Sequence, residues 1–98
     1  MAAVAVRCEG NRAEGWSCQV TLSEDGLAVS SHEVRVRWSD MERLAPAASE
    51  PTGLVEASFG FLLERESPSQ ILRSFDLLDI ARYFPDYEQT MRRRARAT

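Results

Sequence analysis

The chain has 98 residues, of which 44 % are hydrophobic, and its formal net charge is −3. This length supports one small hydrophobic core, so we predict a single domain over residues 1–98 with little room for a large substrate cleft. No segment approaches the roughly 18 apolar residues of a membrane helix, and the apolar N-terminal run is too short for a signal peptide. We therefore expect a cytoplasmic protein that does not bind a membrane.

Charge and cysteine content add two expectations. All 12 basic residues are arginine, a bias typical of a GC-rich bacterial genome. Four of them lie in the last eight residues, while the rest of the chain has eight arginines and 15 acidic residues. Cys8 and Cys18 have neither CxxC nor zinc-site spacing. We interpret them as small buried hydrophobic residues with reduced thiols, as the cytosol favours, with a redox pair as the alternative.

Residues 1–38 show an alternation of apolar and polar side chains with a period of two. The alternating positions are Val4, Val6 and Cys8, then Trp16, Cys18, Val20 and Leu22, then His32, Val34, Val36 and Trp38. This pattern is typical of antiparallel strands with one buried and one wet face. Asp25-Gly26 predicts a tight hairpin between the second and third strands, and the first connection is longer. We predict a three-stranded antiparallel meander.

Helical periodicity takes over in residues 39–98. The expected elements are a short turn at Met41–Leu44, a helix from about Thr52 to Glu66, one opened by Ser67-Pro68-Ser69-Gln70, one capped by Asp76 and ended by Pro85, and one from Asp86 toward Arg96. Each start has a capping residue, and three of them, Ser67, Asp76 and Asp86, have a partner three residues later. We predict an α+β fold with three or four helices packed on one face of the meander.

The segment Ser58–Tyr87 reads SFGFLLERESPSQILRSFDLLDIARYFPDY. It resembles the signature SFxFLLERExPxxILxxFDLxxIxxYFPxY of a family of small uncharacterised bacterial proteins with a β-rich N-terminal part. The resemblance covers about a third of the chain, and only Gly60 departs from the residue type expected there. It implies kinship in fold and nothing about chemistry.

The residues predict no catalytic, cofactor-binding or metal-binding site, and we expect the protein not to be an enzyme. The chain lacks a nucleophile elbow and a phosphate-binding glycine loop. His32 shares its parity with Val34 and Val36, so we interpret it as a structural or surface histidine, with a ligand or general base as the alternative. Asp76, Asp79 and Asp86 are expected at helix starts. Glu64 and Glu66 are expected on a solvated ion-pair face around Arg65.

The C-terminal arginines are the first functional lead. Arg92, Arg93, Arg94 and Arg96 form a cluster that can bind nucleic-acid phosphates. The same cations complement the C-terminal end of a helix dipole, and they can pair with the acidic body of the protein or of a second copy. Because that body repels phosphate, we rank nucleic acid below a protein partner.

Aromatic content is the second lead. The chain has eight aromatic residues, and a core of this size does not easily cover all of them. We expect some on an exposed patch that binds another protein or a second copy, with Phe61, Tyr83, Tyr87 and Trp38 as candidates. The alternative is a core that buries them all. Our main hypothesis is a non-enzymatic protein–protein interaction module, and the alternative is a nucleic-acid-associated regulator, such as an antitoxin-like protein.

Overall fold

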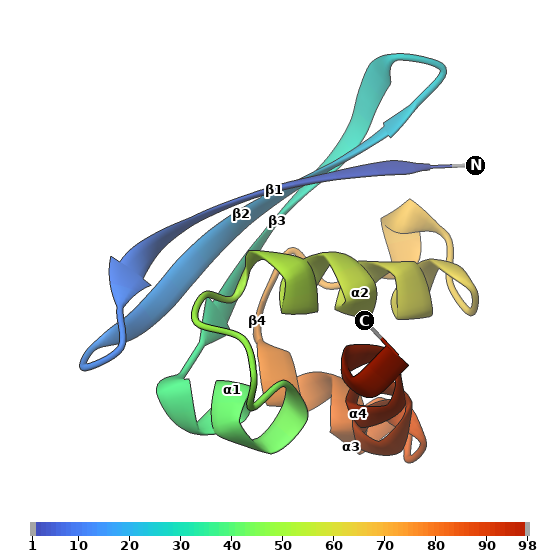
Figure 1. Ribbon diagram of the computed structural model, residues 1–98. Coiled ribbons are helices and arrows are strands. Elements are labelled where there is room, and N and C mark those ends of the chain that lie inside the picture. The colour runs from blue at the N-terminus through green and yellow to red at the C-terminus, as the bar shows by residue number, and fades with distance from the viewer. Residues whose placement is uncertain (1, 98) are drawn as a thin grey trace.

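The computed structural model describes residues 2–97, with side-chain surroundings for residues 2–94. The fold is α+β, and helices cover one face of a four-stranded sheet (Figure 1). Strands β1 (Ala3–Asn11), β2 (Gly15–Glu24) and β3 (Leu27–Val36) form the predicted antiparallel meander. A short strand, β4 (Ser74–Asp76), pairs in parallel with β3 and makes the sheet mixed. The sequence pattern does not predict it.

The two hairpin connections use backbone conformations that favour glycine. Asp25 and Gly26 have φ of 53° and 80°, the positive values of the tight turn predicted between β2 and β3. Between β1 and β2, a loop over residues 12–14 separates Asn11 from its partner Gly15, whose φ is 85°. A three-residue loop followed by a left-handed glycine is a common hairpin connection, and it sets the register of these two strands.

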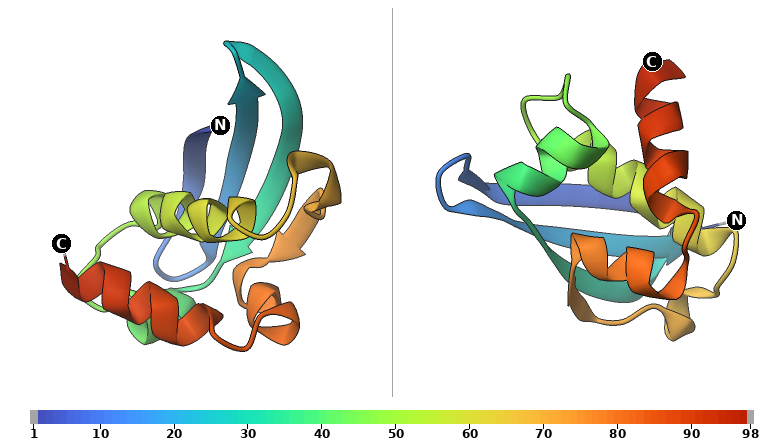
Figure 2. Two further views of the ribbon diagram at one scale, coloured as in Figure 1. Left: turned by 90° about the vertical axis from the view of Figure 1, so that its right-hand side faces the viewer. Right: turned by 90° about the horizontal axis from the view of Figure 1, so that it is seen from below.

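Four α-helices and two 3₁₀ turns follow within the described residues. They are α1 (Trp38–Leu44), α2 (Thr52–Leu63), η1 (Pro68–Gln70), η2 (Leu77–Asp79), α3 (Ile80–Tyr83) and α4 (Tyr87–Ala97). Helix α2 lies next to the sheet, and α1, α3 and α4 form a second tier on its far side (Figure 1, Figure 2). Among these helices none has the length and apolar character needed to cross a membrane.

The prediction of a helix after Ser67 is wrong. Its capping box forms, with the Ser67 N–H donating to Gln70 Oε1 at 2.8 Å, but only the single turn η1 follows. The chain is then extended, because the Glu33 N–H of β3 donates to Arg73 O at 2.7 Å and holds the segment at the sheet edge. Another capping box, formed by Asp76 and Asp79, begins η2, and α3 follows directly, as predicted.

The main core lies between the sheet and α2. Inward residues of the central strand, such as Val20, are fully buried, whereas Val4 and Val6 of the edge strand β1 are half-buried. Phe59 of α2 packs against Phe75 of β4, with ring centroids 6.0 Å apart. The opposite face of β1 and β2 is largely exposed, as the alternating pattern predicts.

The expectation of two reduced thiols is also wrong. Cys8 and Cys18 form a disulfide, and their Cα atoms are 4.0 Å apart. The two residues are direct partners in the register of β1 and β2. The physical reason is the three-residue hairpin loop, which places Cys8 and Cys18 opposite each other with their side chains on the same face of the sheet.

Candidate binding site

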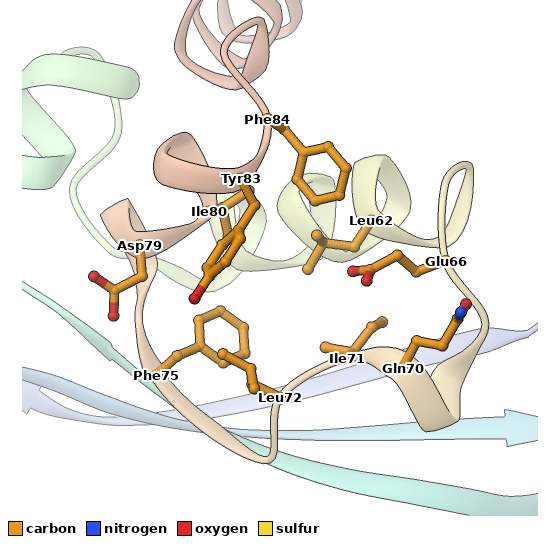
Figure 3. A pocket seen from close by; sticks show the side chains of 10 residues that line it. All are labelled: Leu62, Glu66, Gln70, Ile71, Leu72, Phe75, Asp79, Ile80, Tyr83 and Phe84. Atoms are coloured by element: carbon orange, nitrogen blue, oxygen red, sulfur yellow. The ribbon is translucent and has the colours of Figure 1, made fainter.

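A pocket of about 340 Å³ opens beside β4, between the C-terminal end of α2 and helix α3 (Figure 3). Its lining residues are Leu62, Glu66, Gln70, Ile71, Leu72, Phe75, Asp79, Ile80, Tyr83 and Phe84. They come from the end of α2, from η1 and the extended segment after it, from β4, and from η2 with α3. The volume is at the lower end of the range of small-molecule pockets, about 300–1,000 Å³.

The wall formed by residues 71–73 is attached to the sheet by two hydrogen bonds. His32 Nδ1 lies 2.7 Å from Leu72 O, and the backbone N–H of Glu33 donates to Arg73 O at 2.7 Å. Since a carbonyl oxygen only accepts, His32 Nδ1 carries the proton of the first bond. Its other nitrogen, Nε2, lies 2.9 Å from Ser30 Oγ. This buried histidine therefore positions the pocket wall, as the structural interpretation of His32 expects.

The pocket interior is apolar, and one carboxylate points into it. The floor consists of Leu62, Ile71, Phe75 and Ile80, which are all buried. The Glu66 side chain is directed toward these residues (Figure 3), and it forms no hydrogen bond or ion pair with any side chain described in residues 2–94. Because Glu66 is half-buried beside these apolar groups, its unpaired carboxylate attracts a cation.

Two other polar side chains of the lining, Asp79 and Gln70, already form hydrogen bonds within the protein. The Asp79 carboxylate points away from the gap (Figure 3) and accepts the Asp76 N–H at 3.2 Å. Gln70 uses its Oε1 in the capping box with Ser67. Glu66 is therefore the charged group in the lining that is available to a ligand.

The rim of the pocket exposes two large apolar side chains. Leu72 is 54 % exposed and Tyr83 is 68 % exposed. Two other residues in the described part of the chain, Leu27 and Val29 on the β2–β3 hairpin, are large, hydrophobic and similarly exposed. The pocket thus has an apolar floor that continues onto an apolar rim.

The four aromatic candidates separate into different environments. Tyr83 lies exposed on the pocket rim, so its role as a binding residue stays a prediction. Phe61 and Tyr87 are fully buried, because they pack edge-on against each other at 5.4 Å between α2 and α4. Neither can contact a partner on the surface of the folded protein, which corrects that expectation. Trp38 is half-buried, with the Arg12 guanidinium 3.9 Å from its ring centroid.

The arginine cluster is also divided. Arg92 and Arg93 are exposed on α4. Arg94 is half-buried, pairs with Glu64 at 3.1 Å and donates to Ala57 O at 3.4 Å. The side chain of Arg96 lies outside the described residues. One member of the cluster therefore pairs with the acidic body of the protein, as one of the alternatives anticipated.

Titratable groups within the core have structural partners. The Ser58 hydroxyl donates to Leu54 O at 2.8 Å, so the Tyr87 hydroxyl donates to Ser58 Oγ at 2.7 Å. Burial raises the pKa of Tyr87 well above its ordinary value, which keeps the phenol protonated at neutral pH. Within the described residues, no group of three or more His, Cys, Asp or Glu side chains converges as a metal site would require.

Sequence reasoning does not identify Leu72 or Glu66 as site residues. Leu72 follows a helix-start signal, so its periodicity resembles that of a buried helical residue. Glu66 is one of 15 acidic residues, and its neighbour Arg65 suggests an ordinary ion pair. Arg65 instead pairs with Glu64 and with Asp86, which leaves Glu66 directed into the pocket.

Comparisons of the chain with protein-family models, curated proteins and solved structures find no match. The resemblance of Ser58–Tyr87 to a bacterial family therefore stays a prediction.

Proposed function

We propose that the protein is a non-catalytic protein-binding module whose pocket receives a bulky apolar side chain of its partner. The observation that carries this proposal is the continuity of the buried apolar floor with Leu72 and Tyr83 on the rim. A pocket that holds one anchor side chain, surrounded by further apolar contact, is the usual form of a protein-binding hot spot. Exposed apolar surface of this kind otherwise favours aggregation, so its presence supports a covered state.

Glu66 defines the chemistry expected next to the anchor. Its carboxylate lies at an apolar surface and has no partner among the described side chains, so an arginine or lysine of the bound segment would pair with it. An acidic residue at the same place would be repelled. We therefore expect the partner segment to carry a leucine, isoleucine or aromatic residue close to a basic residue.

Selection from a displayed random peptide library tests this proposal. Peptides selected on the wild-type protein are expected to share an apolar residue close to arginine or lysine. Their affinity is expected to fall at least about tenfold for a Leu72→Glu/Tyr83→Glu variant, because the anchor contact contributes 1.4 kcal/mol or more. A Glu66→Gln variant is expected to lose up to about fivefold, the effect of one partly exposed ion pair.

Leu27→Glu/Val29→Glu is the matched control, because Leu27 and Val29 are 72 % and 47 % exposed on the hairpin, away from the pocket residues. It introduces the same two charges at similarly exposed apolar positions, and affinity is expected to stay unchanged. Selected peptides that bind the Leu72→Glu/Tyr83→Glu variant as tightly as the wild type would refute the pocket as the site. A consensus with acidic residues beside the anchor would refute the role of Glu66.

The alternative function, binding of nucleic acid, is supported by the exposed side chains of Arg92 and Arg93 on one helix. The partnering of Arg94 and the net charge of −3 reduce that support. Fluorescence anisotropy with a labelled duplex DNA at low and high salt measures it directly. We expect weak binding that is abolished in an Arg92→Ala/Arg93→Ala variant and by salt. Tight, salt-dependent binding would reverse the ranking.

A further inference from the structure

The free edge of the sheet is formed by β1, which lies at one end of the strand order β1-β2-β3-β4. Within the described residues, no backbone hydrogen bond joins its outer side to another element. The strand is nine residues long, which is long for an edge, and contains neither proline nor lysine. Proteins usually protect such an edge against pairing, because it offers unpaired N–H and C=O groups to another strand.

The register with β2 shows which backbone groups face outward. The Cα atoms of Cys8 and Cys18 are only 4.0 Å apart, which is typical of the close, non-hydrogen-bonded pairs of an antiparallel ladder. Cys8 therefore directs its N–H and C=O away from β2, and alternation extends this to Val6 and Val4. The outer edge thus presents regularly spaced donors and acceptors in phase with the half-buried apolar side chains of the strand.

The side chains of β1 are complementary to a second copy of the same strand. Arg7 and Glu9 are exposed on the wet face, two residues apart. When two β1 strands pair in antiparallel orientation about Cys8, Arg7 of each lies directly opposite Glu9 of the other. Cross-strand pairs of opposite charge stabilise a sheet, whereas pairing about Arg7 would place two like charges together.

We propose that β1 joins the β1 strand of a second copy, so that two four-stranded sheets become one continuous eight-stranded sheet. The two-fold axis passes between the two Cys8 residues, and two Arg7–Glu9 ion pairs select the register. Because the contact is confined to one strand and its neighbours, the association is weak, as is usual for interfaces below about 1,200 Å².

Sedimentation velocity over a range of about 5–500 µM tests the association directly, since weak interfaces of this size dissociate in that range. We expect the sedimentation coefficient to rise from monomer to dimer with concentration. Val6→Pro is expected to abolish the rise while circular dichroism stays native, because the lost N–H faces outward. Ala5→Pro removes an N–H that bonds β2 and is expected to destabilise the fold.

Charge exchange provides a test that does not alter the backbone. Arg7→Glu and Glu9→Arg are each expected to reduce dimer formation at least fivefold, because each places like charges opposite one another. The double variant Arg7→Glu/Glu9→Arg is expected to restore it. A monomer at every concentration, or a dimer that is unaffected by Val6→Pro and by the single charge changes, would overturn the proposal. The pocket variant Leu72→Glu/Tyr83→Glu is expected to dimerise normally, which separates this inference from the proposed function.

Discussion

Gly60 is the residue whose cost to the stability of its own helix is clearest. It lies in the interior of α2, and a β-carbon there would meet only Arg94 Nη1 at 3.9 Å, an ordinary van der Waals contact. No described neighbour therefore lies close enough to α2 at this point to require a glycine. We expect Gly60→Ala to raise the free energy of unfolding by about 0.5–1 kcal/mol, through the reduced entropy of the unfolded chain. Urea denaturation measures the change.

Gly10 is the control for this prediction. Its φ is 141°, and a β-carbon would lie 2.2 Å from Gly15 O, so Gly10→Ala is expected to destabilise the protein. If Gly60→Ala also lowered stability, α2 would have to be more closely packed at this point than the geometry indicates.

At the residue scale, periodicity identifies apolar positions but not which of them remain exposed. Phe61 and Tyr83 are both aromatic residues of helical segments. Phe61 is buried because α4 and Phe84 close over it, whereas Tyr83 is exposed because no described element packs on that side of α3. The difference arises from the arrangement of elements distant in sequence. Sequence reasoning therefore names Tyr83, which lies on the pocket rim, and does not name Leu72 or Glu66.

At the scale of elements, the hairpin of β1 and β2 is closed by both its ladder and a disulfide. The cross-link between Cys8 and Cys18 spans a sequence separation of 10, and closure of a loop of this size is worth about 3 kcal/mol in the chain-entropy model. We expect Cys8→Ala/Cys18→Ala to lower the free energy of unfolding by about 2–3 kcal/mol. The change in urea midpoint, measured without reductant, gives the value.

Reduction of the wild-type protein is the companion measurement. A reductant is expected to shift the wild-type midpoint toward that of the double variant and to leave the double variant unchanged. A wild-type protein whose stability is indifferent to reductant, and whose mass shows two free thiols before reduction, would contradict the cross-link.

The elements themselves are predictable to different degrees. The meander and its Asp25-Gly26 turn depend on local alternation, so the sequence pattern predicts them. The capping box at Ser67 signals a start but carries no information on length, and the chain leaves the helical path because β3 offers a free edge about 40 residues earlier in the chain. Strand β4 and the pocket wall at Leu72 depend on this non-local pairing, which period-two or helical patterns do not show.

At the scale of the whole molecule, the two proposed surfaces are separate. Strands β1 and β4 lie at opposite edges of the sheet. The dimer edge uses β1, and the pocket is lined by Phe75 of β4. A dimer joined through β1 therefore leaves both pockets open, one at each outer edge of the continuous sheet. Such an assembly presents two equivalent sites, so a partner with two binding segments would gain avidity from it.

Stability of the whole molecule at high pH depends on Tyr87, which connects α2 with α4. Its hydroxyl donates to Ser58 Oγ, and burial raises its pKa. The unfolded chain releases the phenol proton near pH 10, whereas the folded protein retains it. Above that pH the unfolded state binds fewer protons, so this site is expected to lower the free energy of unfolding by about 1.4 kcal/mol per pH unit. Below it, the site contributes no pH dependence.

Comparison with Tyr87→Phe isolates this contribution, because other groups that titrate in alkaline solution are common to both proteins. The variant removes one hydrogen bond, at a cost of about 1 kcal/mol, while Ser58 keeps its bond to Leu54 O. Urea denaturation of both proteins from pH 8 to 11 is expected to show parallel stability below about pH 10 and a steeper decline of the wild type above it. Equal slopes throughout would mean that Tyr87 ionises in the folded protein as readily as in the unfolded chain, and that the contact between α2 and α4 opens before the rest of the fold.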